Sequence, residues 1–220
     1  MLNKEKYLSS ETFDKDISLI YNELDGDIRK TQRWNATIER SALIITDLQN
    51  YFLSPGSHAF IPSAPAIIFN VQKLADLFRK NNRPVILTKH VNTKENAASM
   101  AYWWKDLIPD EAPSAAIIEN LILPGDTILQ KNQYDAFHET RLEAILKENN
   151  VLYPVICGVM ANLCCETTTR SAFVRGFRPV MPVDATAAYN REFHLATFRN
   201  LGFGFSPLMT SKKVIDTLRK

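Results

Sequence analysis

Cysteine is scarce in this sequence. The 220 residues include three cysteines, Cys157, Cys164 and Cys165, which lie close together in the second half of the chain. An odd number of cysteines, in a chain without an export signal, argues against a disulfide framework. The second ligand pair that a structural zinc site needs is also missing. The roles that remain for these thiols are packing in the core or a reactive group.

An excess of charge of one sign and long apolar runs are lacking too. Lys and Arg number 26 and Asp and Glu 24, so the formal net charge is +2, which gives no support for a nucleic acid or an anionic membrane surface as partner. No apolar run approaches the roughly 18 residues of a membrane span, and the charged first residues do not resemble a secretory signal. These absences favour a cytoplasmic protein with a small-molecule partner.

Hydrophobic residues make up 45% of the chain, which is enough for the core of one ordinary domain. Residues 1–40 differ from the rest because they are rich in charge and asparagine. Their apolar residues recur at helical spacing and predict an amphipathic helical arm, which packs on the body or on a neighbouring subunit. These apolar residues are Ile17, Ile20, Tyr21, Leu24 and Ile28. Residues 41–220 are expected to form the domain itself.

From Ser41 onward, short apolar β-branched runs alternate with helical periods. This alternation predicts an α/β fold of three layers, in which an open, mostly parallel sheet of about six strands has helices on both faces. The expected strands are Ala42–Thr46, Pro84–Thr88, Thr127–Gln130, Leu152–Cys157 and Arg178–Val183, with a short edge at Ser206–Thr210.

Two helices and one insertion are expected between these strands. Residues 65–80 carry an apolar stripe, and residues 140–149 begin with Thr140 as a cap three positions before Glu143. The stretch from Thr93 to Glu119 interrupts the alternation with aromatic residues and prolines. A long aromatic insertion of this kind either walls a pocket or seals a small cluster of its own.

Three polar residues follow strands whose carboxyl ends meet at one rim of the sheet, where ligands bind in folds of this class. Asp47 ends the first strand, Lys131 follows the third, and Cys164 lies shortly after the fourth. Cys164 is expected in the first turn of a helix, where the helix dipole and a nearby ammonium favour the thiolate. Asp47 is expected to take the thiol proton and later to deliver it to a leaving group.

The same residues resemble the isochorismatase-like cysteine hydrolase superfamily, which includes nicotinamidases, N-carbamoylsarcosine amidohydrolases and isochorismatases. The resemblance covers about Ser41 to Thr210 and depends on three separated blocks, whose order and spacing together make it specific. The blocks are Asp47-Leu48-Gln49 with Tyr51-Phe52; Lys131 with Tyr134, Ala136, Phe137, Thr140 and Leu142; and Gly158-Val159 through Cys164 to Glu166, Thr168 and Ala172, followed by Asp184-Ala185.

The resemblance implies a catalytic triad of Asp47, Lys131 and Cys164. It also implies a cis peptide bond between Val159 and Met160, and an oxyanion hole formed by the backbone amides of Met160 and Cys164. The implied reaction transfers the acyl group of an amide or carbamoyl C–N bond to Cys164, and water then hydrolyses the thioester. The resemblance implies no cofactor and a homo-oligomer, a dimer or a tetramer.

A metal site is not expected. Nicotinamidases carry an Asp-x-His metal cluster after the second strand, whereas this chain reads Thr88-Lys89-His90-Val91-Asn92. We therefore predict no zinc and interpret His90 as a side chain that lines the pocket. The predicted substrate-binding residues are Gln49, Phe52, His90, Trp103, Trp104 and Tyr134, and Tyr51, Arg191 and Asn162 are further candidates for substrate contact.

Two other functions stay open at this point. The Gln49–Phe52 block and the Trp103-Trp104 pair resemble the isochorismatase branch, in which an aspartic acid protonates a vinyl ether and the cysteine can be absent. In that case Asp47 would be the acid and Cys164 would be dispensable. A catalytically idle binding module on the same scaffold is the third interpretation, with the N-terminal arm as its contact surface.

Overall fold

The protein is built around a parallel sheet of five strands in the order β3-β2-β1-β4-β5. The computed structural model describes residues 3–25, 34–104 and 106–220. The strands are β1 (Ser41–Thr46), β2 (Val85–His90), β3 (Thr127–Lys131), β4 (Tyr153–Val159) and β5 (Thr186–Ala187). This confirms the predicted parallel α/β fold.

The middle of the sheet is formed by β1, which pairs with β2 on one side and with β4 on the other. Every residue of β1 and of β4 is buried. Strands that are covered on both faces read as continuous apolar runs, because neither face meets water. This is why the central strands could be recognised in the sequence without an alternating pattern.

The two last predicted strands are reduced to single bridges, so the count is five strands rather than about six. Residues 178–183 contribute a bridge between Val180 and Val155, and residues 206–210 one between Met209 and Pro182. Proline has no N–H to donate to a strand partner. Pro179, Pro182 and Pro207 therefore interrupt these segments, and β5 forms between Pro182 and Pro207.

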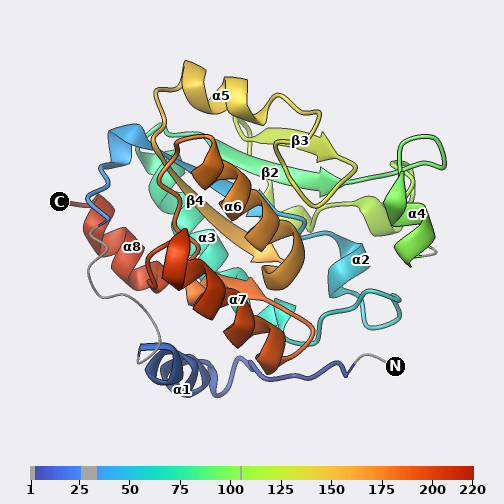
Figure 1. Ribbon diagram of the computed structural model, residues 1–220, viewed down its shortest axis with the longest axis horizontal. Helices are drawn as coiled ribbons and strands as arrows, with labels where there is room; N and C mark the ends of the chain where they lie inside the picture. The colour runs from blue at the N-terminus through green and yellow to red at the C-terminus, as the bar shows by residue number, and fades with distance from the viewer. Residues whose placement is uncertain (1–2, 26–33, 105) are drawn as a thin grey trace.

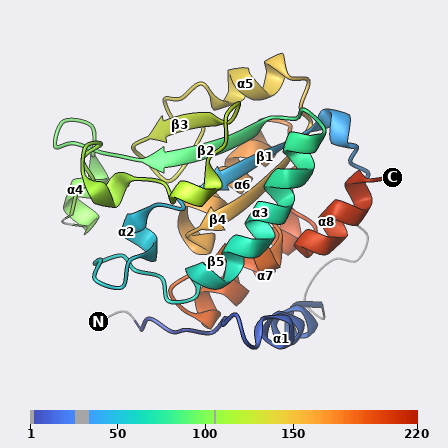
Figure 2. The same ribbon diagram turned by 180° about the vertical axis from the view of Figure 1, so that it is seen from behind.

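Helices cover both faces of the sheet. Figure 2 shows α3 (Ala64–Lys80) lying across one face, and Figure 1 shows α6 (Glu166–Val174) and α7 (Arg191–Gly204) in front of the other. The predicted stripe of α3 is buried, with Ile67, Val71, Leu74 and Phe78 fully inside. The shorter α5 (Leu142–Glu148) and α8 (Ser211–Leu218) complete these layers.

The predicted helix at 140–149 is shorter than expected. Its first helical residue is Leu142, and the hydroxyl of Thr140 accepts a hydrogen bond from the Leu142 N–H at 3.1 Å. Thr140 thus holds the chain just before the helix, and its hydroxyl also donates to the carbonyl of Ala136 at 2.6 Å.

The N-terminal arm packs on the body of its own chain. Its helix α1 (Phe13–Asp25) buries Ile17, Ile20 and Leu24, whereas Ile28 lies outside the described residues. Before the helix, the Tyr7 hydroxyl lies 2.8 Å from Nδ1 of His194 and accepts a hydrogen bond from the Ala188 N–H at 2.9 Å. The arm is therefore joined to α7 and to the segment that precedes it.

Two short helices lie where the strands end. In Figure 1 the strand arrows point towards α2 (Asn50–Leu53) and α4 (Ser99–Trp104). The single-turn helices are η1 (Ile38–Arg40), η2 (Pro113–Ala115), η3 (Glu119–Leu121), η4 (Ala161–Cys165) and η5 (Val183–Ala185). In the described part of the chain, no helix has the length and apolar character to cross a membrane.

Candidate active site

The three predicted strand-end residues meet at the carboxyl edge of the sheet. Nζ of Lys131 lies 2.8 Å from Oδ2 of Asp47 and 3.4 Å from Sγ of Cys164. Asp47 follows β1, Lys131 ends β3 and Cys164 lies in η4, directly after β4. All three side chains are buried, and Cys164 keeps 5% of its surface exposed. The prediction that they meet in one place is confirmed.

Asp47 is held from the neighbouring strand β2. Its backbone N–H donates to the hydroxyl of Thr88 at 3.1 Å, and that hydroxyl donates to Oδ1 of Asp47 at 2.5 Å. The residue has φ of 50°, in the left-handed region that only a few non-glycine residues adopt. Among the described residues, Oδ2 accepts no hydrogen bond of good geometry. Oδ1 is therefore fixed by Thr88, and Oδ2 is available to the Lys131 ammonium and the Cys164 thiol.

The Lys131 ammonium occupies the centre of the cluster. It lies 2.9 Å from the carbonyl oxygen of Gln133 and 3.2 Å from Nδ1 of His90, in addition to its contacts with Asp47 and Cys164. Asp47, His90 and Cys164 offer ligand atoms within 4.8 Å of one another, a spacing that can suit a metal ion. Because Nζ of Lys131 approaches each of these residues within 3.4 Å, the cationic position between them is already filled.

The thiol of Cys164 is neutral in this environment. Burial raises its pKa to about 12; the ammonium of Lys131 opposes this shift, and Asp47 adds to it. The expectation of a thiolate favoured at a helix start is therefore not met in the resting site, because removal from water outweighs the nearby positive charge. Lys131 remains an ammonium: burial alone would lower its pKa, but the carboxylate of Asp47 raises it.

The turn that carries Cys164 begins with an unusual stretch of backbone. The peptide bond between Val159 and Met160 is cis, and Gly158 has φ of 106°. A Cβ atom at position 158 would lie 2.1 Å from the carbonyl oxygen of Thr46, which faces it in β1. Only glycine fits there. The end of β4 is thus held against the end of β1, which places η4 beside Asp47.

A pocket opens in front of Cys164. Of the predicted site residues, Phe52, His90, Trp104, Tyr134 and Met160 line it together with Cys164. The remaining lining residues are Tyr51, Ala59, Asn92, Met100, Asp106, Ile108, Leu163 and Tyr189. Most of these side chains are aromatic or aliphatic, which is typical of small-molecule sites.

The aromatic insertion walls this pocket and is fastened to the body at several points. Nε1 of Trp104 donates to the hydroxyl of Tyr134 at 2.6 Å, and the Tyr51 hydroxyl donates to Asp106 at 2.7 Å. Further along the insertion, Asp110 forms an ion pair with Lys89 of β2. Of the two interpretations of the insertion, the structure supports the wall of a pocket.

Two predicted substrate contacts lie elsewhere. Gln49 is fully buried, and its amide is occupied: Nε2 donates to the carbonyls of His90 and Ala115, and Oε1 accepts from the His90 N–H at 2.8 Å. Gln49 therefore joins β1, β2 and the insertion, and it does not line the pocket. Trp103 also lies outside the lining, with 71% of its surface exposed.

Comparison with known proteins agrees with this site. The family model described as the isochorismatase domain matches residues 41–213. The chain belongs to the isochorismatase family. It is a hydrolase of that family, and the resemblance inferred from the three sequence blocks is confirmed.

Two named enzymes and one solved structure are similar to this chain. Nicotinamidase 3 of Arabidopsis thaliana is 36% identical over 194 residues, which cover 86% of this chain and 94% of that protein. N-carbamoylsarcosine amidase of Arthrobacter is 32% identical over 181 residues, which cover 78% of this chain and 66% of that enzyme. The structure of a cysteine hydrolase from Pseudomonas syringae pv. phaseolicola 1448A has a TM-score of 0.79 at 25% identity, covering 85% of this chain and 96% of that one.

Some pocket residues of this isochorismatase-family site were missed in the sequence. Asn92 lies two residues after the end of β2, and Tyr189 follows β5. Their places after strand ends were the signal that could have identified them, as it did for Lys131. Arg191 and Asn162 do not line the pocket; Arg191 instead forms an ion pair with Glu23 of the arm at 2.6 Å.

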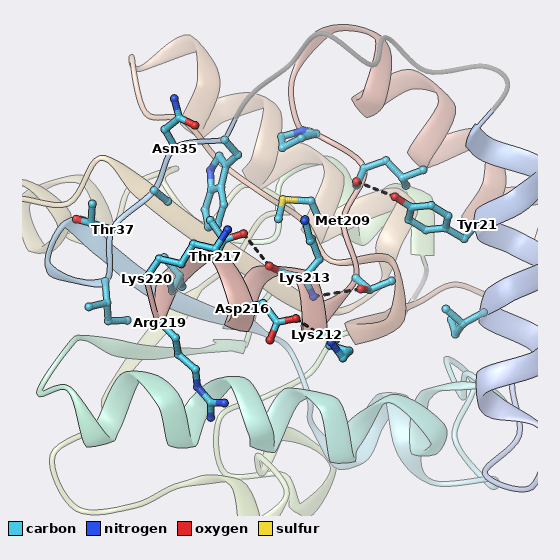
Figure 3. A pocket seen from close by; sticks show the side chains of 18 of the residues that line it. Tyr21, Asn35, Thr37, Met209, Lys212, Lys213, Asp216, Thr217, Arg219 and Lys220 are labelled. Carbon is cyan, nitrogen blue, oxygen red and sulfur yellow. Dashed lines mark hydrogen bonds and ion pairs between the residues drawn. The ribbon is translucent and has the colours of Figure 1, made fainter.

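A second hollow lies at the opposite, amino-terminal edge of the sheet (Figure 3). Its volume is about 1410 Å³, and side chains from α1, from the segment before β1 and from α8 line it, among them Tyr21, Asn35 and Lys213. The described residues that line it include none of the predicted site residues. The two hollows are therefore separate features of this fold.

Proposed function

We propose that this protein hydrolyses the C–N bond of a small carboxamide or carbamoyl compound, with Cys164 as the nucleophile. The observation that carries the proposal is the buried contact of Lys131 Nζ with Asp47 Oδ2 at 2.8 Å and with Cys164 Sγ at 3.4 Å. In this cluster the carboxylate is the acid–base group, the ammonium is a fixed positive charge and the thiol is the nucleophile.

The first step transfers the thiol proton to Asp47. Because Oδ1 is held by Thr88, Oδ2 is the oxygen that takes the proton as Sγ attacks the carbonyl carbon. The thiol stays protonated until substrate is present, so the reactive thiolate forms only during the attack. The Lys131 ammonium stabilises the negative charge as it moves between Asp47 and Cys164.

The negative charge that develops on the carbonyl oxygen needs hydrogen-bond donors. We assign this role to the backbone N–H groups of Met160 and Cys164, at the turn that follows the cis bond. Asp47 then gives its proton to the departing nitrogen, and the C–N bond breaks to leave a thioester on Cys164. Water, deprotonated by Asp47, attacks the thioester and the C–S bond breaks to release the acid. Asp47 then returns the proton to the sulfur, which restores the free thiol.

No step of this sequence requires a cofactor. The three residues whose spacing suits a metal ion already surround the Lys131 ammonium, so we propose that the site works without a metal. The aromatic lining fits a flat acyl group. The relatives named nicotinamidase and N-carbamoylsarcosine amidase make nicotinamide and N-carbamoylsarcosine the first substrates to examine.

The decisive experiment compares the wild type with Cys164→Ala and Asp47→Asn on a panel of carboxamides, carbamoyl compounds and isochorismate. We expect ammonia release from an amide substrate, a thioester on Cys164 detectable by mass spectrometry, and loss of both in either variant. Pyruvate release from isochorismate that survives in Cys164→Ala and is lost in Asp47→Asn would establish the vinyl ether reaction instead. An inactive wild type on the whole panel favours the idle binding module.

We also propose a cytoplasmic homo-oligomer, a dimer or a tetramer. Phe173 and Val174 of α6 and Phe203 of α7 are large apolar side chains with 46%, 78% and 62% of their surfaces exposed, and the two helices share one face of the molecule (Figure 1). Apolar surface of this kind favours subunit contact. A light-scattering mass of one chain at micromolar concentration contradicts the proposal.

A further inference from the structure

The hydrogen-bonding state of His90 follows from its neighbour Lys131. Nδ1 of His90 lies 3.2 Å from Nζ of Lys131, and an ammonium carries three N–H donors and no lone pair. His90 is neutral, because burial, and then the charge of Lys131, lower its pKa to about 4, against the opposing effect of Asp47. Its single proton therefore resides on Nε2, and Nδ1 offers its lone pair to the ammonium.

The amide of Asn92 is also fixed in one orientation. Its Oδ1 accepts a hydrogen bond from the Ile108 N–H at 2.9 Å, while the backbone N–H of Asn92 donates to the Ile108 carbonyl at 3.0 Å. Because Oδ1 is held by the insertion, Nδ2 faces the imidazole, 3.3 Å from Nε2 of His90. The Nδ2 group can only donate.

Two donors therefore face each other, Nε2–H of His90 and Nδ2–H of Asn92. They cannot bond to each other, and within the described residues neither has another partner. The opposite tautomer of His90 satisfies Asn92 but turns an N–H towards the Lys131 ammonium, which is the more costly contact because that partner carries a full charge. Both side chains are more than nine-tenths buried, and both line the pocket beside Cys164.

We infer that His90 and Asn92 form a subsite for a neutral hydrogen-bond acceptor on the acyl part of the substrate, such as a ring nitrogen or a second carbonyl oxygen. This inference rests on the proposed function and narrows its substrate class. A buried donor without a partner is costly, so an acyl group that supplies an acceptor is favoured over one of the same shape that does not. The pair thereby determines specificity, separately from the groups that perform the reaction.

The first test measures the tautomer and ligand contact directly. In ¹⁵N NMR spectra at neutral pH, with the His90 signals assigned by their loss in His90→Gln, we expect a proton on Nε2 and none on Nδ1. In Cys164→Ala, at least one of the pyridine-2-, pyridine-3- and pyridine-4-carboxamides is expected to shift the Nε2–H signal, and benzamide is not. A proton on Nδ1, or equal shifts with benzamide, overturns the inference.

The second test uses Asn92→Asp, in which one carboxylate oxygen still accepts from Ile108 while the donor is lost. We expect the kcat/KM of the best pyridinecarboxamide, relative to benzamide, to fall roughly tenfold in this variant. Asn96→Asp is the matched control, because Oδ1 of Asn96 likewise accepts a backbone N–H, that of Thr93, on the exposed side of the same segment. An unchanged ratio in Asn92→Asp, or an equal fall for both amides, contradicts the inference.

The two proposals fail in different ways. If the enzyme releases no ammonia from any amide while the Nε2–H signal responds to a pyridinecarboxamide, the proposed reaction is wrong and the subsite stands. If amides are hydrolysed through Cys164 while His90 carries its proton on Nδ1, the reaction stands and the subsite is wrong.

Discussion

The hydroxyl of Thr88 and the carboxylate of Asp47 are joined twice: the hydroxyl accepts from the Asp47 backbone N–H at 3.1 Å and donates to Oδ1 at 2.5 Å. Thr88 belongs to β2, and Asp47 follows β1. The neighbouring strand therefore determines which carboxylate oxygen faces Lys131 and Cys164.

Replacing this hydroxyl tests whether the orientation of Asp47 matters for the reaction. We expect Thr88→Val to lower kcat about tenfold or more, because Oδ1 loses its donor and the carboxylate is free to turn. Thr88→Ser, which keeps the hydroxyl, is expected to retain most of the activity. Steady-state kinetics on the best amide substrate measure the effect, and equal kcat for Thr88→Val and wild type contradicts it.

Because Asp47 and Lys131 form an ion pair, the effects of replacing each of them on the free energy of unfolding are expected not to add. Both side chains are fully buried, so Lys131→Met leaves a buried carboxylate without its counter-charge and is expected to lower the free energy of unfolding by about 3–5 kcal/mol. The double variant Asp47→Asn with Lys131→Met removes both charges and is expected to be more stable than the single lysine variant. Urea unfolding of the four proteins measures the coupling, and strictly additive changes contradict it.

At Gly158 even the addition of one methyl group is expected to destabilise the fold. In Gly158→Ala the new methyl group meets the backbone of Thr46 at 2.1 Å, at a φ of 106°. We expect a loss of more than about 3 kcal/mol in the free energy of unfolding, because the β1–β4 pairing must open. Gly56→Ala is the matched control, since no atom lies within 4 Å of its added Cβ. Equal stability of the two variants contradicts the prediction.

The buried imidazole of His194 is expected to make the free energy of unfolding depend on pH in mild acid. Burial lowers its pKa to about 3, whereas the unfolded chain binds a proton at this residue near pH 6.5. Between these two values, acid favours the unfolded state by about 1.4 kcal/mol per pH unit for this group. His194→Asn, which keeps an acceptor for Tyr7, is expected to reduce the slope of unfolding free energy against pH by that amount between pH 6 and 4. An unchanged slope contradicts the assignment.

The strands that formed as predicted are those whose sequence pattern follows directly from burial. Residues 41–46 and 153–159 are apolar because both of their faces are covered, and a short apolar run between turns is a sufficient signal. Residues 178–183 carry the same apolar pattern, but they include Pro179 and Pro182. Two lost donors within this short segment decided against a ladder, whereas the single Pro154 of β4 did not prevent one. An apolar pattern alone does not reveal this difference.

The candidate site was predictable to the extent that it depends on strand order. Asp47, Lys131 and Cys164 were identified because each follows a parallel strand. Gln49 and Trp103 were interpreted as substrate contacts, but the direction of a side chain on an irregular loop is determined by tertiary hydrogen bonds such as that of Gln49 with the His90 backbone. The protonation of Cys164 depends on burial, which local sequence does not reveal.

The N-terminal arm connects its own sequence changes to the pocket. Through Glu5 and Tyr7 it is bonded to the backbone of Tyr189 and Ala188, and Tyr189 forms part of the pocket wall. A change at residues 3–10, outside the residues 41–213 that the family model matches, is thus expected to reach the pocket through the backbone of that wall. Natural variants, tags or cleavage there are best judged by KM as well as by folding.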